Sequence, residues 1–163
     1  MSGAVVITCS NRSAAGVRDD QSGELLAQAV AQWGFRLLDK VVVPDQVTAI
    51  QDAVRAAVAG GARLVLTTGG TGVTPTDVTP EAVSPLLDRT IPGIAERLRA
   101  ANVEQVPTAV LSRGVAGLIG DALVVTLPGS PGGVRDGIAV LRPLVGHVLD
   151  QVGGGDHRAG GGV

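Results

Sequence analysis

Glycines, hydroxyl groups and one carboxylate are concentrated in residues 67–81, Thr-Thr-Gly-Gly-Thr-Gly-Val-Thr-Pro-Thr-Asp-Val-Thr-Pro-Glu. Gly69, Gly70 and Gly72 have no Cβ, so the backbone N–H groups beside them can approach a bulky anion. The threonines add hydroxyl donors, and Asp77 is the one aspartate in the stretch. This composition indicates a site for a phosphate-bearing ligand with a divalent cation. For the glycines alone, a connector without a ligand is the alternative.

The stretch differs from two well-known phosphate-binding motifs. A P-loop needs a lysine followed by serine or threonine after its glycines, and Lys40 is the only lysine in the chain. The dinucleotide fingerprint needs a glycine spacing that this stretch does not have. Arginine or a metal ion is therefore expected to supply the positive charge.

Composition favours one domain that binds a small molecule. The chain has 163 residues, of which 45% are hydrophobic and 1% aromatic, with a net charge of −2. This length fits a single domain with an aliphatic core, which we expect over residues 1–152. Scarce aromatic rings and a slightly negative charge argue against nucleic-acid binding. The glycine-rich residues 153–163 are expected to form a disordered tail.

The remaining composition argues against a disulfide, a metal cluster and a membrane segment. Cys9 is the only cysteine and is expected to be buried in the first strand. His147 and His157 are too few, and too poorly placed, for a zinc site. No signal region and no long apolar run are present, so we expect a cytoplasmic protein without membrane contact.

The pattern of apolar runs and turn residues predicts alternating strands and helices. Strands are expected at residues 4–9, 37–43, 64–68, 108–111 and 122–127. Helices are expected at residues 22–32, 47–59, 94–101 and 131–152, with a further one capped by Thr79. Such alternation predicts an α/β fold, a three-layer α/β/α sandwich with a mostly parallel sheet.

Chemically suggestive residues follow the ends of four predicted strands. They are Ser10, Asp45, the glycine stretch, and residues 128–130, Pro-Gly-Ser. In open α/β sheets, ligands bind outside the carboxyl ends of the strands. The four loops are therefore expected to meet at one edge and form a composite site.

Several of these segments, in this order, resemble the molybdopterin-binding family of the Mog/MoaB type. The similarity covers about residues 4–150 and is carried by these motifs: residues 67–72 with 77–82, 20–23, 43–45, 91–93 with Glu96, 107–108, 111–113 and 127–130. The family has an α/β sandwich fold and is usually a homotrimer. Its activity is Mg²⁺-dependent transfer of AMP from ATP to the terminal phosphate of molybdopterin, which releases pyrophosphate. The product goes on to a molybdenum insertase.

The resemblance implies a role for two acids. Asp45 and Asp77 would be catalytic, holding Mg²⁺ or orienting the attacking phosphate. Asp45 could instead be a turn residue after Pro44, and Asp77 could stabilise a helix N-terminus.

The resemblance also implies a set of substrate-binding positions. They are Ser10, Asp20, Ser22, Gly23, Thr68, Gly69, Gly70, Thr71, Gly72, Glu96, Ser112, Arg113, Pro128, Gly129 and Ser130. Ser22 could be only a helix cap, and Glu96 could lie on a solvated helix face. Arg113 is expected to bind phosphate, with a surface ion pair as the alternative.

One departure leaves a second function open. Residues 10–12, Ser-Asn-Arg, resemble the MoaB-type start, whereas many Mog-type members have an acid directly after the serine. A non-catalytic molybdopterin-binding or carrier protein is therefore the alternative to the adenylyltransferase. The retained Asp77-Val78-Thr79-Pro80 favours the enzyme. A molybdenum-insertion module is not expected, since those proteins are longer.

Overall fold

The structure, a computed structural model, describes residues 1–155 and is an α/β fold. Its strands are β1 (Gly3–Cys9), β2 (Arg36–Val43), β3 (Ala62–Thr68), β4 (Arg89–Thr90), β5 (Ala116–Ile119) and β6 (Ala122–Leu127). Its α-helices are α1 (Asn11–Ala14), α2 (Gln21–Gln32), α3 (Val47–Ala59), α4 (Thr79–Val83), α5 (Pro92–Ala100), α6 (Pro131–Leu141) and α7 (Val145–Val152). Two 3₁₀ helices, η1 (Ser84–Leu86) and η2 (Pro107–Leu111), complete the described part.

The strands form one six-stranded sheet in the order β2-β1-β3-β6-β5-β4. Strands β2, β1, β3 and β6 are parallel, whereas β5 and β4 run antiparallel to their neighbours. The inner strands β1 and β6 are buried along their whole length, as expected for apolar runs covered on both faces. The predicted mostly parallel sheet is confirmed.

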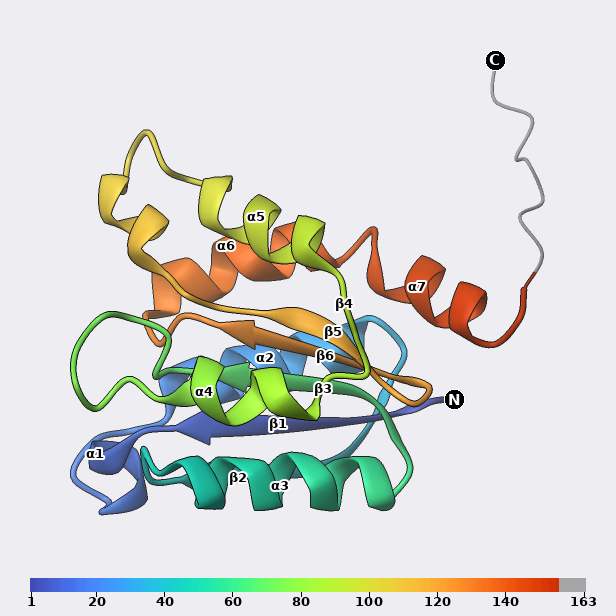
Figure 1. Cartoon of the computed structure of the whole chain (residues 1–163), viewed down its shortest axis with the longest axis horizontal. Helices are drawn as coiled ribbons and strands as arrows, with labels where there is room; N and C mark the ends of the chain where they lie inside the picture. The colour runs from blue at the N-terminus through green and yellow to red at the C-terminus, as the bar shows by residue number, and fades with distance from the viewer. Residues whose placement is uncertain (156–163) are drawn as a thin grey trace.

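Helices cover both faces of this sheet, because alternate side chains of each strand point to opposite faces. On one face, Val6 of β1 belongs to the same core cluster as Leu26 of α2, and helices α5, α6 and α7 cover this face as well. On the other face, Ile7 packs in a cluster with Ile50 of α3 and with residues of α4. Figure 1 shows α3 on one side of the sheet and α5, α6 and α7 on the other. The expected three-layer sandwich is confirmed.

The prediction of a strand at residues 108–111 is wrong, because these residues belong to the 3₁₀ helix η2. Pro107 begins this helix, where its missing N–H is not needed, and Val110 and Leu111 are exposed at 57% and 51%. On the side of β6 away from β3, the paired strand is β5, which continues through Gly120 into a hairpin. Its short sequence, Ala-Gly-Leu-Ile, carries little strand signal.

Two helix predictions also need correction. The helix expected at residues 131–152 is divided into α6 and α7, with Pro143 in the break between them. Thr79 lies inside α4 and Val78 occupies the N-cap position, so the hydroxyl of Thr79 is available for another partner.

The C-terminal boundary differs in part from the expectation. Residues 153–155 form a turn whose N–H groups donate to carbonyls of α7. Residues 156–163, the rest of the expected tail, lie outside the described residues. Among residues 1–155, none of the helices has the length and apolar character needed to cross a membrane.

Candidate functional site

Loops from four parallel strands surround a cavity of about 790 Å³ at the carboxyl edge of the sheet. The expected site residues that line it are Ser10, Asp20, Ser22, Asp45, Thr68, Gly69, Gly70, Asp77, Gly129 and Ser130. A second cavity of about 380 Å³ lies beside it. Thr71, Gly72, Ser112 and Pro128 line only this second cavity, whereas Gly70, Asp77, Gly129 and Ser130 line both. The two cavities therefore meet at the glycine stretch.

The backbone of the glycine stretch has a conformation that requires glycine. Gly69 and Gly70 have φ angles of 94° and 69°, in the left-handed region. A Cβ on Gly70 would clash with Oγ1 of Thr79 and lie 3.2 Å from Oδ1 of Asp45. Within residues 1–155, the N–H groups of Gly70, Thr71 and Gly72 have no hydrogen-bond acceptor. Consecutive free N–H groups of this kind can bind an anion.

Hydrogen bonds hold the glycine stretch against its neighbours. The N–H of Gly69 donates to the carbonyl of Leu127 at 3.0 Å, and the hydroxyl of Thr68 donates to the carbonyl of Pro128 at 2.7 Å. The hydroxyl of Thr79 donates to the carbonyl of Gly69 at 2.9 Å. The backbone of this loop is therefore tied to both β6 and α4.

Asp45 is half-buried just after β2, and its two carboxylate oxygens differ in their hydrogen bonding. Oδ2 accepts a hydrogen bond from the N–H of Asn11 at 3.1 Å. Oδ1 is buried and has no hydrogen-bond partner among the described residues. Burial raises the pKa of Asp45, the negative charge of Asp77 raises it further, and the Asn11 hydrogen bond opposes both. A buried carboxylate oxygen without a donor is suited to bind a cation.

Asp77 is half-buried where the two cavities meet. Its Oδ2 accepts hydrogen bonds from the N–H and the hydroxyl of Thr74, at 3.0 and 2.8 Å. The same oxygen lies 2.7 Å from where a Cβ on Gly72 would be, which explains the third glycine of the stretch. The side chain is thus bonded to its own loop, so the structure does not favour the helix-terminus alternative for Asp77.

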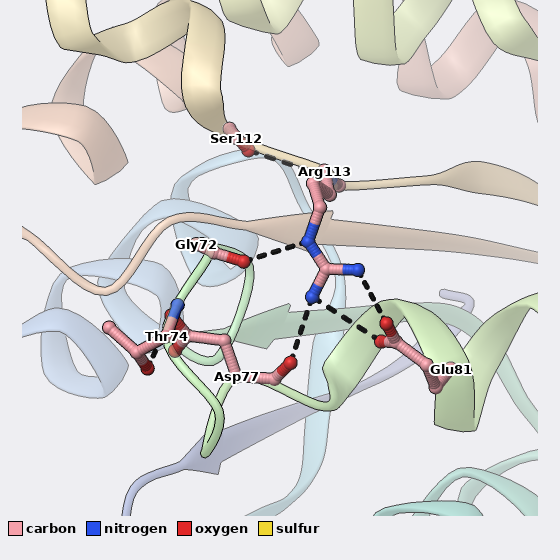
Figure 2. A network of polar contacts seen from close by, with 7 residues as sticks. Gly72, Thr74, Asp77, Glu81, Ser112 and Arg113 are labelled. Atoms are coloured by element: carbon pink, nitrogen blue, oxygen red, sulfur yellow. Dashed lines mark hydrogen bonds and ion pairs between the residues drawn. The ribbon is translucent and has the colours of Figure 1, made fainter.

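Arg113 is bound to the protein and not directed into either cavity. Its Nε–H donates to the carbonyl of Gly72 and one Nη2–H to the carbonyl of Asp77, both at 2.8 Å. Its guanidinium also forms an ion pair with Glu81 of α4, which holds the pKa of Glu81 below its usual range. Figure 2 shows this guanidinium between the glycine stretch and α4. The ion-pair alternative for Arg113 is therefore favoured over phosphate binding.

Other expected positions have mainly structural contacts. Glu96 is exposed on α5 and lines neither cavity. Gly23 also lines neither cavity, and its N–H donates to Asp20 at 3.0 Å, so that Asp20 caps α2. Ser22 is not the helix cap, because its hydroxyl donates to the carbonyl of Gly129 at 2.8 Å. Burial raises the pKa of Cys9 to about 12, so its thiol stays protonated.

Several residues of the first loop were missed as site residues from sequence. Asn11, Arg12 and Arg18 line the larger cavity beside Asp45. Arg12 and Arg18 thus line this cavity, whereas Arg113 lines neither of the two cavities. Their place in the loop after the first strand was a usable signal, because that loop reaches the same edge as Asp45.

The geometry can now be compared with known proteins. A family model described as "Probable molybdopterin binding domain" matches residues 5–147. The chain belongs to this molybdopterin-binding family. The family and the fold that the sequence predicted are therefore confirmed.

Individual relatives extend the comparison. The chain is 38% identical to the molybdopterin adenylyltransferase of Pyrococcus furiosus over 149 residues, 88% of this chain and 87% of the relative. It is 40% identical over 154 residues, 94% of its length, to the molybdenum cofactor biosynthesis bifunctional protein of Synechococcus elongatus, but spans only 48% of that protein. The solved structure of the molybdopterin biosynthesis Mog protein from Mycobacterium ulcerans is similar with a TM-score of 0.89 and 46% identity, covering 93% of this chain and 99% of that one.

Proposed function

We propose that this chain is a molybdopterin adenylyltransferase that transfers AMP from ATP to the terminal phosphate of molybdopterin. Its similarity to an adenylyltransferase over most of both chains supports this assignment. The observation that carries it is the meeting of two cavities at Gly70 and Asp77, since two substrates bound in adjoining cavities would bring their phosphates together there.

The reaction needs positioning more than proton transfer. An oxygen of the molybdopterin phosphate would attack the α-phosphorus of ATP, and the bond from that phosphorus to the β-phosphate oxygen would break. Pyrophosphate leaves with the bonding electrons. Because the nucleophile is already an anion, no general base is required. The N–H groups of Gly70, Thr71 and Gly72 and the guanidinium groups of Arg12 and Arg18 are suited to bind phosphate oxygens.

The acidic residues fit a magnesium ion. Among residues 1–155 no group of three or more histidine, cysteine, aspartate or glutamate side chains is arranged to hold a metal by itself. Mg²⁺ commonly takes one or two carboxylates and completes its shell with water and substrate phosphates. Asp45, through its unpartnered Oδ1, and Asp77 would hold the ion. When bound, the ion neutralises charge on the phosphates.

The assembly and the cellular setting are also proposals. The family resemblance supports a homotrimer and transfer of the product to a molybdenum insertase. The cytoplasmic location expected from the sequence is a proposal as well. Sedimentation velocity of the purified chain measures the oligomeric state, and a monomer would contradict the trimer.

Turnover tests the proposed function. Purified protein with ATP, Mg²⁺ and molybdopterin should release pyrophosphate and form adenylylated molybdopterin. Asp77→Ala should reduce the rate by at least about tenfold. Asp52→Ala is the matched control, because Asp52 is exposed on α3 and lines neither cavity. Tight binding of molybdopterin without turnover of ATP would contradict the enzyme and support the carrier alternative.

A further inference from the structure

Asn11 and Asp45 form a reciprocal pair of hydrogen bonds across 34 positions of sequence. The N–H of Asp45 donates to Oδ1 of Asn11 at 2.8 Å, and the N–H of Asn11 donates to Oδ2 of Asp45 at 3.1 Å. Just before this pair, the N–H of Ser10 donates to the carbonyl of Val43 at 2.9 Å, which extends the β1–β2 pairing. The pair therefore joins the loops that follow two adjacent parallel strands.

This pairing determines which oxygen of Asp45 is available. With Oδ2 bound to Asn11, the carboxylate turns Oδ1 toward Cα of Gly70, where an added Cβ would lie 3.2 Å from it. Oδ1 is the buried oxygen that has no donor among the described residues. The orientation of this carboxylate thus depends on the backbone and side chain of Asn11.

We propose that Asn11 is a positioning residue that directs Oδ1 of Asp45 to the cation and adds no charge of its own. The proposal rests on the proposed function for the identity of the reaction, but the pairing itself is independent of it. Asn11 touches neither cation nor phosphate in this role; it acts through Asp45.

The chemistry of the asparagine side chain explains the residue type. Its Oδ1 accepts from the N–H of Asp45 without a charge. An aspartate at position 11 would keep this acceptor and add a further carboxylate to the cavity that Asp45 and Asp77 line. An alanine would keep the backbone N–H that donates to Oδ2 of Asp45 but remove the acceptor of the Asp45 N–H, so one hydrogen bond and not two would hold Asp45 in place. Comparing asparagine, aspartate and alanine at position 11 therefore distinguishes an effect on the orientation of Asp45 from an effect of added charge.

Binding of Mn²⁺ alone, followed by the electron paramagnetic resonance signal of the free ion, tests the proposal. Residues that orient metal ligands typically change affinity by about 10- to 100-fold when mutated. We expect Asn11→Ala to weaken Mn²⁺ binding by about tenfold, whereas Asn11→Asp should bind at least as tightly as the wild type. Asn102→Ala is the control, since Asn102 lines neither cavity.

Steady-state kinetics provides the second readout. Asn11→Ala should lower kcat and raise the Mg²⁺ concentration for half-maximal rate, with the KM for ATP at saturating Mg²⁺ unchanged. A general loss of folding would instead lower the active fraction and leave the Mg²⁺ dependence unaltered. Asn11→Asp should keep kcat near the wild-type value and lower the Mg²⁺ concentration needed for half-maximal rate.

Three results would overturn the proposal: no Mn²⁺ binding by the wild type, wild-type Mn²⁺ binding by Asn11→Ala, or weaker binding by Asn11→Asp than by the wild type. If Asn11→Ala does not fold, the Asn11→Asp measurement decides. If the Mn²⁺ affinities of the wild type and the variants follow the predicted order but the wild type releases no pyrophosphate, the adenylyltransferase assignment is contradicted and the role of Asn11 is supported. If every variant turns over normally with an unchanged Mg²⁺ dependence, the adenylyltransferase assignment is supported and the role of Asn11 is contradicted.

Discussion

The hydroxyl of Thr79 donates a 2.9 Å hydrogen bond to the carbonyl oxygen of Gly69, and this bond is buried. The N–H of Thr79 also donates to the carbonyl of Gly70 at 3.1 Å. One residue at the start of α4 thus satisfies two consecutive carbonyls of the glycine stretch. The carbonyls of the stretch are thus satisfied within the protein, whereas the N–H groups of Gly70, Thr71 and Gly72 have no acceptor among the described residues. Free N–H groups of this kind can bind an anion.

Thr79→Val should lower the free energy of unfolding by about 1–3 kcal/mol, because the buried carbonyl of Gly69 loses its donor. Thr79→Ser is the matched variant, since it keeps the hydroxyl and should lose much less. Urea unfolding of the two proteins measures the difference. Equal stability of the valine and serine variants would show that this hydrogen bond contributes nothing.

Gly70→Ala should be destabilising by about 1–3 kcal/mol and should abolish most turnover, because alanine is strained at a φ of 69° and its Cβ would clash with Thr79. Gly93→Ala is the control: no atom lies within 4 Å of an added Cβ there, and α5 favours alanine. Thermal unfolding and pyrophosphate release measure both effects. Gly70→Ala with wild-type stability would contradict the described loop conformation.

Arg113→Lys should loosen the glycine stretch even though the charge is kept, because one ammonium group cannot reach two carbonyls and Glu81 together. The exposed ion pair contributes little by itself because solvent screens it, so the change should appear mainly as local opening. Hydrogen exchange of the Thr74 and Asp77 N–H groups should become faster. Arg97→Lys, on α5, should leave this exchange unchanged. Exchange at both amides in Arg113→Lys as slow as in the wild type would contradict the prediction that Arg113 holds the glycine stretch in place.

Asp45→Asn should abolish most turnover yet raise the melting temperature at neutral pH. The pKa of Asp45 is raised in the folded state, mainly by burial, so ionisation favours the unfolded chain. The wild type should lose this increment of stability as pH rises from the ordinary aspartate value of about 4 through the raised pKa. The gap between the two proteins should therefore widen with pH over that window. Melting curves recorded without divalent cation measure it, and a gap that narrows with increasing pH would have the wrong sign.

The sequence allowed the family, the α/β architecture and the acids of the site to be predicted. Parallel strands place their carboxyl ends at one edge, so residues after those ends, such as Ser10 and Asp45, must come together whatever the details of packing. The glycine stretch was predictable for a similar reason, because only a few chemical roles need consecutive glycines beside a buried strand.

Local pattern failed where a partner elsewhere in the chain decided the outcome. The strand β5 was missed and residues 108–111 were given as a strand, because pairing with β6 outweighs the weak propensity of each segment. Arg113 was expected to bind phosphate, whereas Glu81 and the carbonyls of the glycine stretch occupy its guanidinium.

The sequence by itself thus determined which residues reach the carboxyl edge of the sheet, since local patterns locate the loops that follow the strands and parallel strands end at one edge. Only the tertiary structure decided how those residues are used. Whether Asp45 presents Oδ1 or Oδ2 depends on Asn11, which lies 34 positions away and meets it only when β1 and β2 pair. Hydrogen bonds of this kind depend on distances of tenths of an ångström, which long-range packing sets and sequence spacing does not.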